Sequence, residues 1–147
     1  MKKTIIIFSL LVMLCSVVWA DLNEDLVRAV YDGNIEEVRW LIEAGADVNS
    51  RDYAWQTVLM QATASEYIEI VELLIDAGAN VNLKGDFGET ALMSAAWHGN
   101  IELARMLVEA GADVNITDDI GETALSNASM NGQAEMVEYL KSMGAVQ

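Results

Sequence analysis

The residues that could carry out chemistry in this 147-residue chain are almost all carboxylates. Aspartate and glutamate number 23 against 8 lysines and arginines, and there is one cysteine, Cys15, and one histidine, His98. A single cysteine excludes an internal disulfide and a cysteine-rich zinc site. With a single histidine as well, most nucleophile–base arrangements and histidine-based metal sites lack their parts. The composition therefore argues against an enzyme, and we expect no cofactor and no metal.

The carboxylates are scattered along the chain rather than paired. Ten of them fall on short helical patterns whose outer face would carry them into solvent, and no isolated pair is set in an apolar pocket, as acid–base catalysis needs. Residues 113–118 resemble the start of a calcium loop, but the sixth and twelfth positions hold Asp118 and Ala124 instead of glycine and glutamate. Two alternatives stay open: an acidic structural or cation-binding protein, and an enzyme that uses carboxylates near Trp97 and His98.

The formal net charge of −15 limits what the surface can bind. Such an acidic surface repels phosphate backbones, so we expect no nucleic-acid partner. The hydrophobic content of 53% is enough for a packed core, so the acidity does not indicate disorder. A protein partner with a basic patch would complement this charge.

The first 20 residues have the pattern of a secretory signal peptide. Lys2 and Lys3 form a positive start, and no charge follows from residue 4 to residue 20. Residues 18–20 read Val-Trp-Ala, with aliphatic and small side chains where a signal peptidase requires them. The pattern therefore predicts export from the cytoplasm.

We expect cleavage after Ala20 and a periplasmic or secreted product. The product would keep 6 basic residues against 23 acidic ones, a net charge of −17. Two alternatives also place the body of the chain across a membrane. One is a lipid anchor on Cys15, which the large preceding Leu14 disfavours, and the other is an uncleaved segment that would be the only membrane contact.

A period of 33 residues organises the rest of the chain. Gly45, Gly78, Gly111 and Gly144 are spaced 33 apart, and the first three lie in blocks that read acidic-Ala-Gly-Ala-Asp/Asn-Val-Asn. A threonine follows each of these three glycines by 12 residues. A period of this length indicates a stack of similar supersecondary units.

Two short helical patterns lie between each threonine and the next glycine. In the third unit we expect them at 90–97 and 101–110. In the unit before it, the second pattern is apolar on two sides, through Val71 and Leu74 on one and Ile70 on the other, as a helix between two neighbours needs. The glycine after each second helix suits a left-handed C-cap, and the stretch beyond it predicts a projecting turn.

These features resemble the ankyrin repeat, whose pattern is Asp-x-x-Gly-x-Thr-x-Leu, two helices, then Gly-Ala-Asp-Val-Asn. The resemblance covers the repeats at 21–51, 52–84, 85–117 and 118–147. It implies an all-α solenoid of four helix-turn-helix repeats with projecting β-turn fingers, preceded by the signal peptide. The second repeat departs most, since Trp55 replaces the finger glycine and Glu66 replaces the glycine between the helices.

The resemblance also implies what the chain does. Ankyrin proteins generally bind protein partners on their concave side, through finger residues and the exposed ends of the first helices. We therefore expect a monomeric, non-catalytic binding module, with support of a periplasmic enzyme and inhibition or immunity as two candidate roles.

The family positions that contact partners carry over to one set of residues here, rich in the aromatic side chains that interface hot spots favour. This set consists of Tyr31, Arg51, Tyr53, Lys84, Phe87, Trp97, His98, Ile120 and Met130. Trp55 is added to it as a further candidate, although it stands at the finger glycine and the sequence does not predict its orientation. The alternative is that the set's large side chains tuck into neighbouring fingers. Trp40 stands at the position of Leu73 and Met106, so we interpret it as a packing residue.

Overall fold

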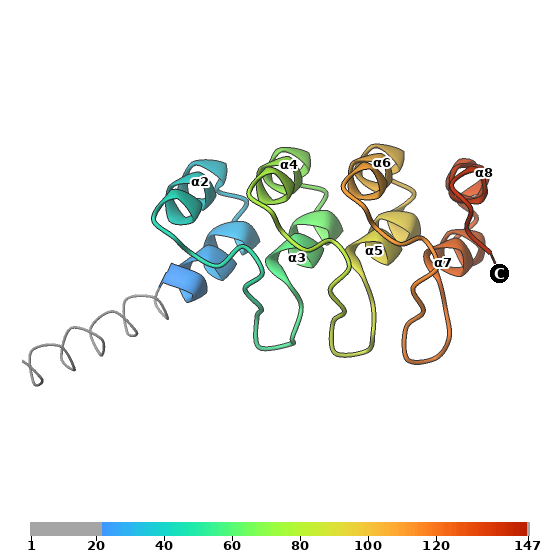
Figure 1. Ribbon diagram of the computed structural model, residues 1–147, viewed down its shortest axis with the longest axis horizontal. Coiled ribbons are helices and arrows are strands. Elements are labelled where there is room, and N and C mark those ends of the chain that lie inside the picture. The colour runs from blue at the N-terminus through green and yellow to red at the C-terminus, as the bar shows by residue number, and fades with distance from the viewer. Residues whose placement is uncertain (1–21, 147) are drawn as a thin grey trace, which may run out of the picture.

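The computed structural model describes residues 22–146, which form two stacked rows of helices with long loops projecting from one side (Figure 1). The signal peptide predicted at 1–20 lies outside the described residues. The inner row contains the helix at 22–31, α3 (Val58–Ala64), α5 (Ala91–His98) and α7 (Ala124–Met130). The outer row contains α2 (Ile35–Glu43), α4 (Ile68–Asp76), α6 (Ile101–Glu109) and α8 (Ala134–Ser142).

Successive helices pair through short turns, one from each row, and each pair stacks on the next. Helix α5 packs against α6 within its pair and against α3 and α7 in the neighbouring pairs. The three long loops, which we call the first (44–57), second (77–90) and third (110–123) finger, join one pair to the next (Figure 1). The all-α helix-turn-helix architecture is therefore as predicted.

A buried threonine starts each inner helix after a finger. The Oγ1 atom of Thr57 accepts a hydrogen bond from the backbone N–H of Met60 at 3.2 Å, and Thr123 does the same for Ser126 at 3.2 Å. These bonds satisfy amide donors that the first turn of a helix leaves unpaired. The threonines that recur every 33 residues thus set where α3, α5 and α7 begin.

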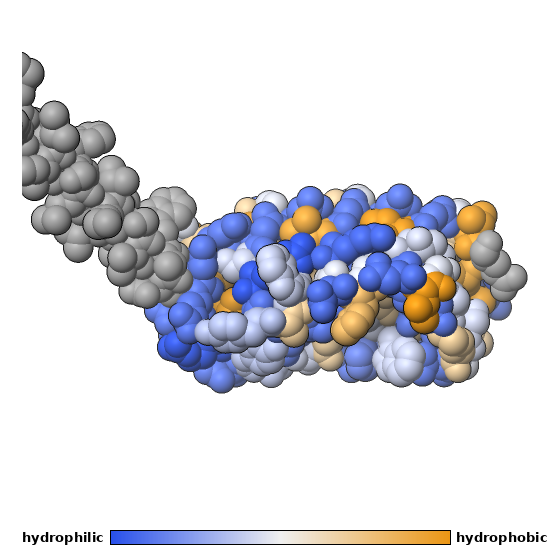
Figure 2. All heavy atoms as spheres, turned by 90° about the horizontal axis from the view of Figure 1, so that it is seen from below, coloured by the Kyte–Doolittle hydropathy of each residue, from blue (hydrophilic) through white to orange (hydrophobic). Residues whose placement is uncertain are grey.

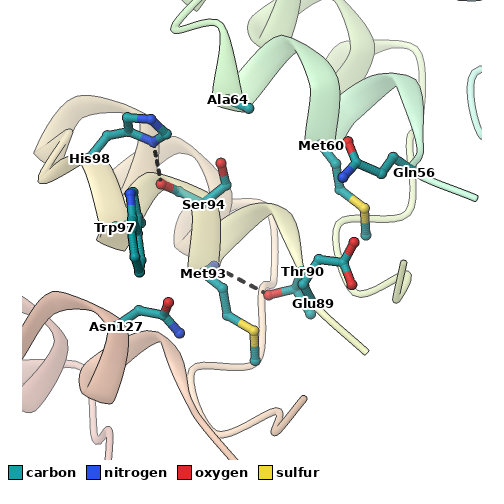
Figure 3. A pocket seen from close by; sticks show the side chains of 10 residues that line it. All are labelled: Gln56, Met60, Ala64, Glu89, Thr90, Met93, Ser94, Trp97, His98 and Asn127. Atoms are coloured by element: carbon teal, nitrogen blue, oxygen red, sulfur yellow. Dashed lines mark hydrogen bonds between the residues drawn. The ribbon is translucent and has the colours of Figure 1, made fainter. Parts of the chain in front are cut away.

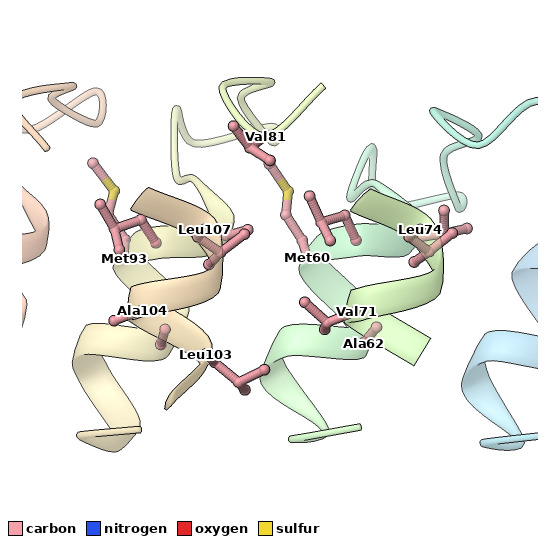
Figure 4. Close-up of a cluster of buried hydrophobic side chains, with 14 of the residues drawn as sticks. Met60, Ala62, Val71, Leu74, Val81, Met93, Leu103, Ala104 and Leu107 are labelled. Atoms are coloured by element: carbon pink, nitrogen blue, oxygen red, sulfur yellow. The ribbon is translucent and has the colours of Figure 1, made fainter. Parts of the chain in front are cut away.

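The hydrophobic core runs between the two rows and repeats with the same period. The inner-row leucines Leu59 and Leu92 and the outer-row leucines Leu74 and Leu107 are almost completely buried. Figure 4 shows side chains of this kind filling the space between neighbouring pairs. Each fully buried leucine contributes about 2 kcal/mol of transfer free energy, so the stack is stabilised in every repeat.

Two residues adopt left-handed backbone conformations that usually require glycine. Trp55 has φ 58° and Glu66 has φ 56°, and these are the two positions at which the sequence lacks the expected glycine. The stacking geometry therefore imposes the conformation even where the side chain disfavours it. By contrast, the glycines after the outer helices have φ between 88° and 99°, as predicted.

The interpretation of Trp40 as a packing residue is wrong, because its side chain is 60% exposed. The equivalent residue of α8, Tyr139, has the cation of Arg105 on the preceding outer helix α6 above its ring, 5.9 Å from the centroid. This position therefore faces the preceding outer helix. Among the described residues no outer helix precedes α2, so none of them covers Trp40 as α6 covers Tyr139.

Candidate partner-binding surface

The fingers are held in shape by carboxylates that accept hydrogen bonds from their own backbones. In the first finger, Asp52 Oδ1 accepts from the N–H groups of Ala54 and Gln56 at 2.8 and 3.0 Å. In the third finger, Asp118 Oδ1 accepts from Ile120 and Glu122 at 3.0 and 2.8 Å. The finger tips are therefore fixed turns rather than loose loops.

The second finger reaches a similar turn by a different route. Gly85 stands where the other fingers have aspartate, and Glu89 Oε2 accepts a hydrogen bond from the N–H of Phe87 at 3.0 Å. A Cβ atom at Gly85 would collide with the Glu89 carboxylate. The glycine thus makes room for the carboxylate of Glu89, which takes over part of the role of the missing aspartate.

The two basic residues of the predicted set connect neighbouring fingers. Arg51 Nη1 donates to the backbone oxygens of Trp55 and Lys84, the latter at 2.8 Å, and Lys84 Nζ donates to the backbone oxygen of Thr117 at 2.6 Å. Sequence reasoning assigned both cations to partner binding and missed this structural contact. The signal that could have shown it is the 33-residue spacing of these positions, since each cation reaches the same position of the next repeat.

The large side chains at the finger tips and at the ends of the inner helices face solvent. Tyr53, Phe87 and Ile120 on the fingers are 95%, 73% and 79% exposed, and Trp97 and Met130 at the helix ends are about half exposed. Seen from the finger side, hydrophobic residues lie among hydrophilic ones and are more frequent towards the C-terminal half (Figure 2). These side chains do not tuck into neighbouring fingers.

A first hollow lies at the N-terminal end of this face, next to Tyr31 and Tyr53. The Tyr31 hydroxyl donates to Asp52 Oδ2 at 2.7 Å, and the Tyr53 hydroxyl donates to Glu24 Oε1 at 3.2 Å. The hydrogen bond to Asp52, with smaller effects from burial and from the charge of Asp52, raises the pKa of Tyr31. The hollow has a volume of about 390 Å³ and also borders Val27.

A second hollow, which we call the central hollow, lies between α3, α5 and α7 and has a volume of about 230 Å³. Met60, Met93 and Trp97 give it an apolar floor and wall, and the carboxylate of Glu89 lies at its finger end (Figure 3). The remaining residues that line it are Gln56, Ala64, Thr90, Ser94, His98 and Asn127.

The structure thus brings only some of the predicted residues together. Trp97 and His98 share the central hollow, and Tyr31 and Tyr53 share the first one. Phe87, Ile120 and Met130 are exposed but line neither, and Trp55, 62% exposed, is also outside both. Met93 and Asn127, which the sequence placed only within helices, contribute to the central hollow because neighbouring inner helices leave a gap there.

The carboxylates of the outer helices behave as a solvated face. Those of α4 and α6, Glu69, Glu72, Asp76, Glu102 and Glu109, are all exposed, as predicted. Among residues 22–146 no three histidine, cysteine, aspartate or glutamate side chains gather in a way that could hold a metal ion. No helix within this part of the chain is long and apolar enough to cross a bilayer.

Comparison with known protein families gives a match over most of the chain. A family profile described as Ankyrin repeats (3 copies) matches residues 26–118 and 83–147. The chain belongs to the ankyrin repeat family. Ankyrin repeats generally mediate protein–protein interactions and typically form non-catalytic binding modules. No curated protein matches the chain.

Proposed function

We propose that this ankyrin repeat protein is a non-catalytic binding module that acts outside the cytoplasm and holds a protein partner against its finger tips and inner-helix ends. The observation that carries the proposal is the row of exposed large side chains on these two features. Tyr53, Phe87 and Ile120 on successive fingers are exposed although nothing in the core requires them to be large. Large, mostly aromatic side chains exposed along one face support an interaction site there, because interface hot spots favour aromatic residues.

The rigidity of the face supports the same function. Carboxylate-fixed turns shape the fingers, and the cations of Arg51 and Lys84 tie each finger to the next. Side chains displayed on such a frame lose little conformational entropy when a partner docks. The chain therefore suits recognition by a preformed surface.

The binding face is tested with the double variant Phe87→Ala, Trp97→Ala. Each truncation of an interface aromatic costs about 2 kcal/mol or more at a hot spot, so together they should reduce partner capture at least 100-fold. The measurement is affinity capture from a periplasmic extract of the source cell, quantified for each retained protein, with circular dichroism to verify the fold.

Trp40→Ala is the matched control, because Trp40 is an aromatic residue whose 60% exposure lies between that of Trp97 and that of Phe87, but it lies on the outer row. It should retain the same partner at the strength of the unmodified chain. A partner that is retained by the double variant but lost by the control would place the binding face on the outer helices instead.

Export is tested by expressing the full chain and determining the N-terminus of the product. Cleavage after Ala20 would give a product that begins at Asp21, and intact mass of the extracytoplasmic fraction checks this. A chain that keeps residues 1–20 and remains in the cytoplasm would overturn the proposed location without affecting the proposed binding face.

A further inference from the structure

The central hollow combines an apolar floor with hydrogen-bond acceptors. The Glu89 carboxylate accepts one hydrogen bond, from the Phe87 N–H, although a carboxylate can accept about four. Asn127 donates one Nδ2 hydrogen to the backbone oxygen of Thr123 at 3.0 Å, which leaves its Oδ1 and its second Nδ2 hydrogen for a ligand. The Nδ1 atom of His98 donates to the backbone oxygen of Ser94 at 2.9 Å, which makes Nε2 of the neutral ring an acceptor.

Glu89 forms no ion pair within residues 22–146. The one ion pair there joins Arg28 to Asp25 at the N-terminal helix. Arg51 and Lys84, on the first and second fingers, donate to backbone oxygens of neighbouring fingers. The remaining basic residues, Arg39, Arg105 and Lys141, lie on outer helices.

We propose that the central hollow receives a lysine or arginine side chain of the partner protein. Its aliphatic stem would lie across Met60, Met93 and Trp97, and its charged end would reach the carboxylate of Glu89. Lysine and arginine carry donors and no acceptors, so they match the acceptors of the hollow, above all the carboxylate of Glu89. Long basic side chains also bury their aliphatic stems on apolar surface while the charged end stays in polar surroundings. A tryptophan ring attracts a nearby cation as well.

This inference rests on the proposed function, because it names the chemistry that the binding face recognises. Charge complementarity favours a cation over the other occupants of the same shape, an aliphatic or an acidic side chain. An aliphatic side chain would desolvate part of the Glu89 carboxylate and offer it no donor beyond the Phe87 N–H, and an acidic one would add a like charge beside it.

The probe is a phage-displayed library of random dodecapeptides, panned on the immobilised protein. The expected binders contain lysine or arginine next to large apolar residues and are lost on the Trp97→Ala variant. One such peptide is then synthesised with its basic residue intact and with methionine in its place, and both are titrated by fluorescence polarisation. Replacing the basic residue should weaken binding about tenfold.

The protein-side variant is Glu89→Gln, which removes the charge but keeps an oxygen that can accept from the Phe87 N–H. It should weaken binding of the basic peptide about tenfold and leave binding of the methionine peptide unchanged. The reason is that Glu89→Gln and the methionine replacement in the peptide remove the same interaction. Glu122→Gln is the matched control: it stands at the same position of the third finger and does not line the central hollow. It should leave both peptides unaffected.

The outcomes separate this inference from the proposed function. Binders that Trp97→Ala loses but that show no preference for basic residues, or that respond equally to Glu89→Gln and Glu122→Gln, overturn the cation site and leave the binding face intact. A library that yields no binder sensitive to Trp97→Ala overturns both. Because the peptide-side change does not alter the protein, a folding defect in a variant cannot hide the result.

Discussion

Trp55 carries a large side chain at a backbone conformation that favours glycine. Its φ of 58° lies in the left-handed region, and the same position of the other two fingers is Gly88 and Gly121. A residue with a Cβ atom pays about 1 kcal/mol or more there. Glu66 has the same strain, but its carboxylate accepts a hydrogen bond from Asn100 Nδ2 at 2.7 Å, which links it to the next repeat. Trp55 is 62% exposed, so burial in the fold does not account for its size. Under the proposed function its side chain would contact the partner.

Replacing Trp55 with glycine should therefore raise stability and lower partner binding. The relieved strain, reduced by the greater freedom of glycine in the unfolded chain, should increase the free energy of unfolding by about 0.5 kcal/mol. Urea unfolding followed by circular dichroism measures this, and affinity capture measures binding. Gly121 also has a left-handed backbone, and a Cβ atom there would meet open space. Gly121→Ala should therefore lower the free energy of unfolding by about 1 kcal/mol through backbone strain alone. A Trp55→Gly variant that is less stable than the unmodified chain would show that the indole packs in the fold.

The exposure of the finger-tip side chains was predictable, whereas their contacts and the exposure of Trp40 were not. Tyr53, Phe87 and Ile120 could be predicted as exposed because the 33-residue pattern places them outside the core. The 33-residue spacing relates Lys84 to Thr117, but whether the side chain reaches that backbone oxygen depends on the offset between stacked repeats, which the spacing alone does not give. Trp40 was misread because the pattern treats all repeats as interior, while its outer helix has no described neighbour on one side.

At the scale of elements, asparagines join each repeat to the next. Asn82 Oδ1 accepts from the N–H of Asp113 at 2.8 Å, and its Nδ2 donates to the backbone oxygen of Gly111 at 3.0 Å. Asn49 and Asn115 make the equivalent acceptor bonds to Asn80 and Val146, at 2.8 and 2.9 Å. In a solenoid each repeat contacts only its neighbours, so these bonds contribute directly to coupling between repeats.

Asn82→Ala should lower the free energy of unfolding by about 2 kcal/mol, because it removes two bonds and leaves their backbone partners unpaired. Asn80→Ala is the matched control, since the Asn80 side chain accepts only from the N–H of Asn82 in its own finger, at 3.0 Å, and should lose less than about 1 kcal/mol. Amide hydrogen exchange distinguishes the two: the N–H of Asp113 should lose protection in Asn82→Ala alone. Equal losses in both variants would mean that the asparagines stabilise their own finger and not the stack.

The elements themselves were largely predictable. The pattern predicted helices at 90–97 and 101–110, and the structure has α5 at Ala91–His98 and α6 at Ile101–Glu109. The agreement arises because threonine caps and left-handed glycines fix both ends of each pair locally. The central hollow could not be predicted in this way, since it forms where Met60, Met93 and Asn127 of three different helices meet.

At the scale of the whole molecule, acidic charge dominates the surface and opposes folding. Residues 22–146 contain 22 carboxylates and six lysines and arginines, and the one ion pair among them, Arg28 with Asp25, is exposed. Like charges that cannot pair repel one another more in the folded chain than in the expanded one. The fold is therefore stabilised by its core against an unfavourable electrostatic energy.

Screening should relieve that repulsion, so the melting temperature should rise with salt. Raising sodium chloride from 10 mM to 500 mM should increase the free energy of unfolding by about 1 kcal/mol. For a domain of this size, that corresponds to a rise of about 4 °C in melting temperature. The control is calcium chloride at matched ionic strength, followed by the same thermal scan in circular dichroism. If the acidic surface does not bind calcium specifically, calcium should raise the melting temperature by no more than this ionic-strength effect. A calcium-specific rise that saturates at low concentration would instead mean that the native state binds the ion, as an acidic cation-binding protein would.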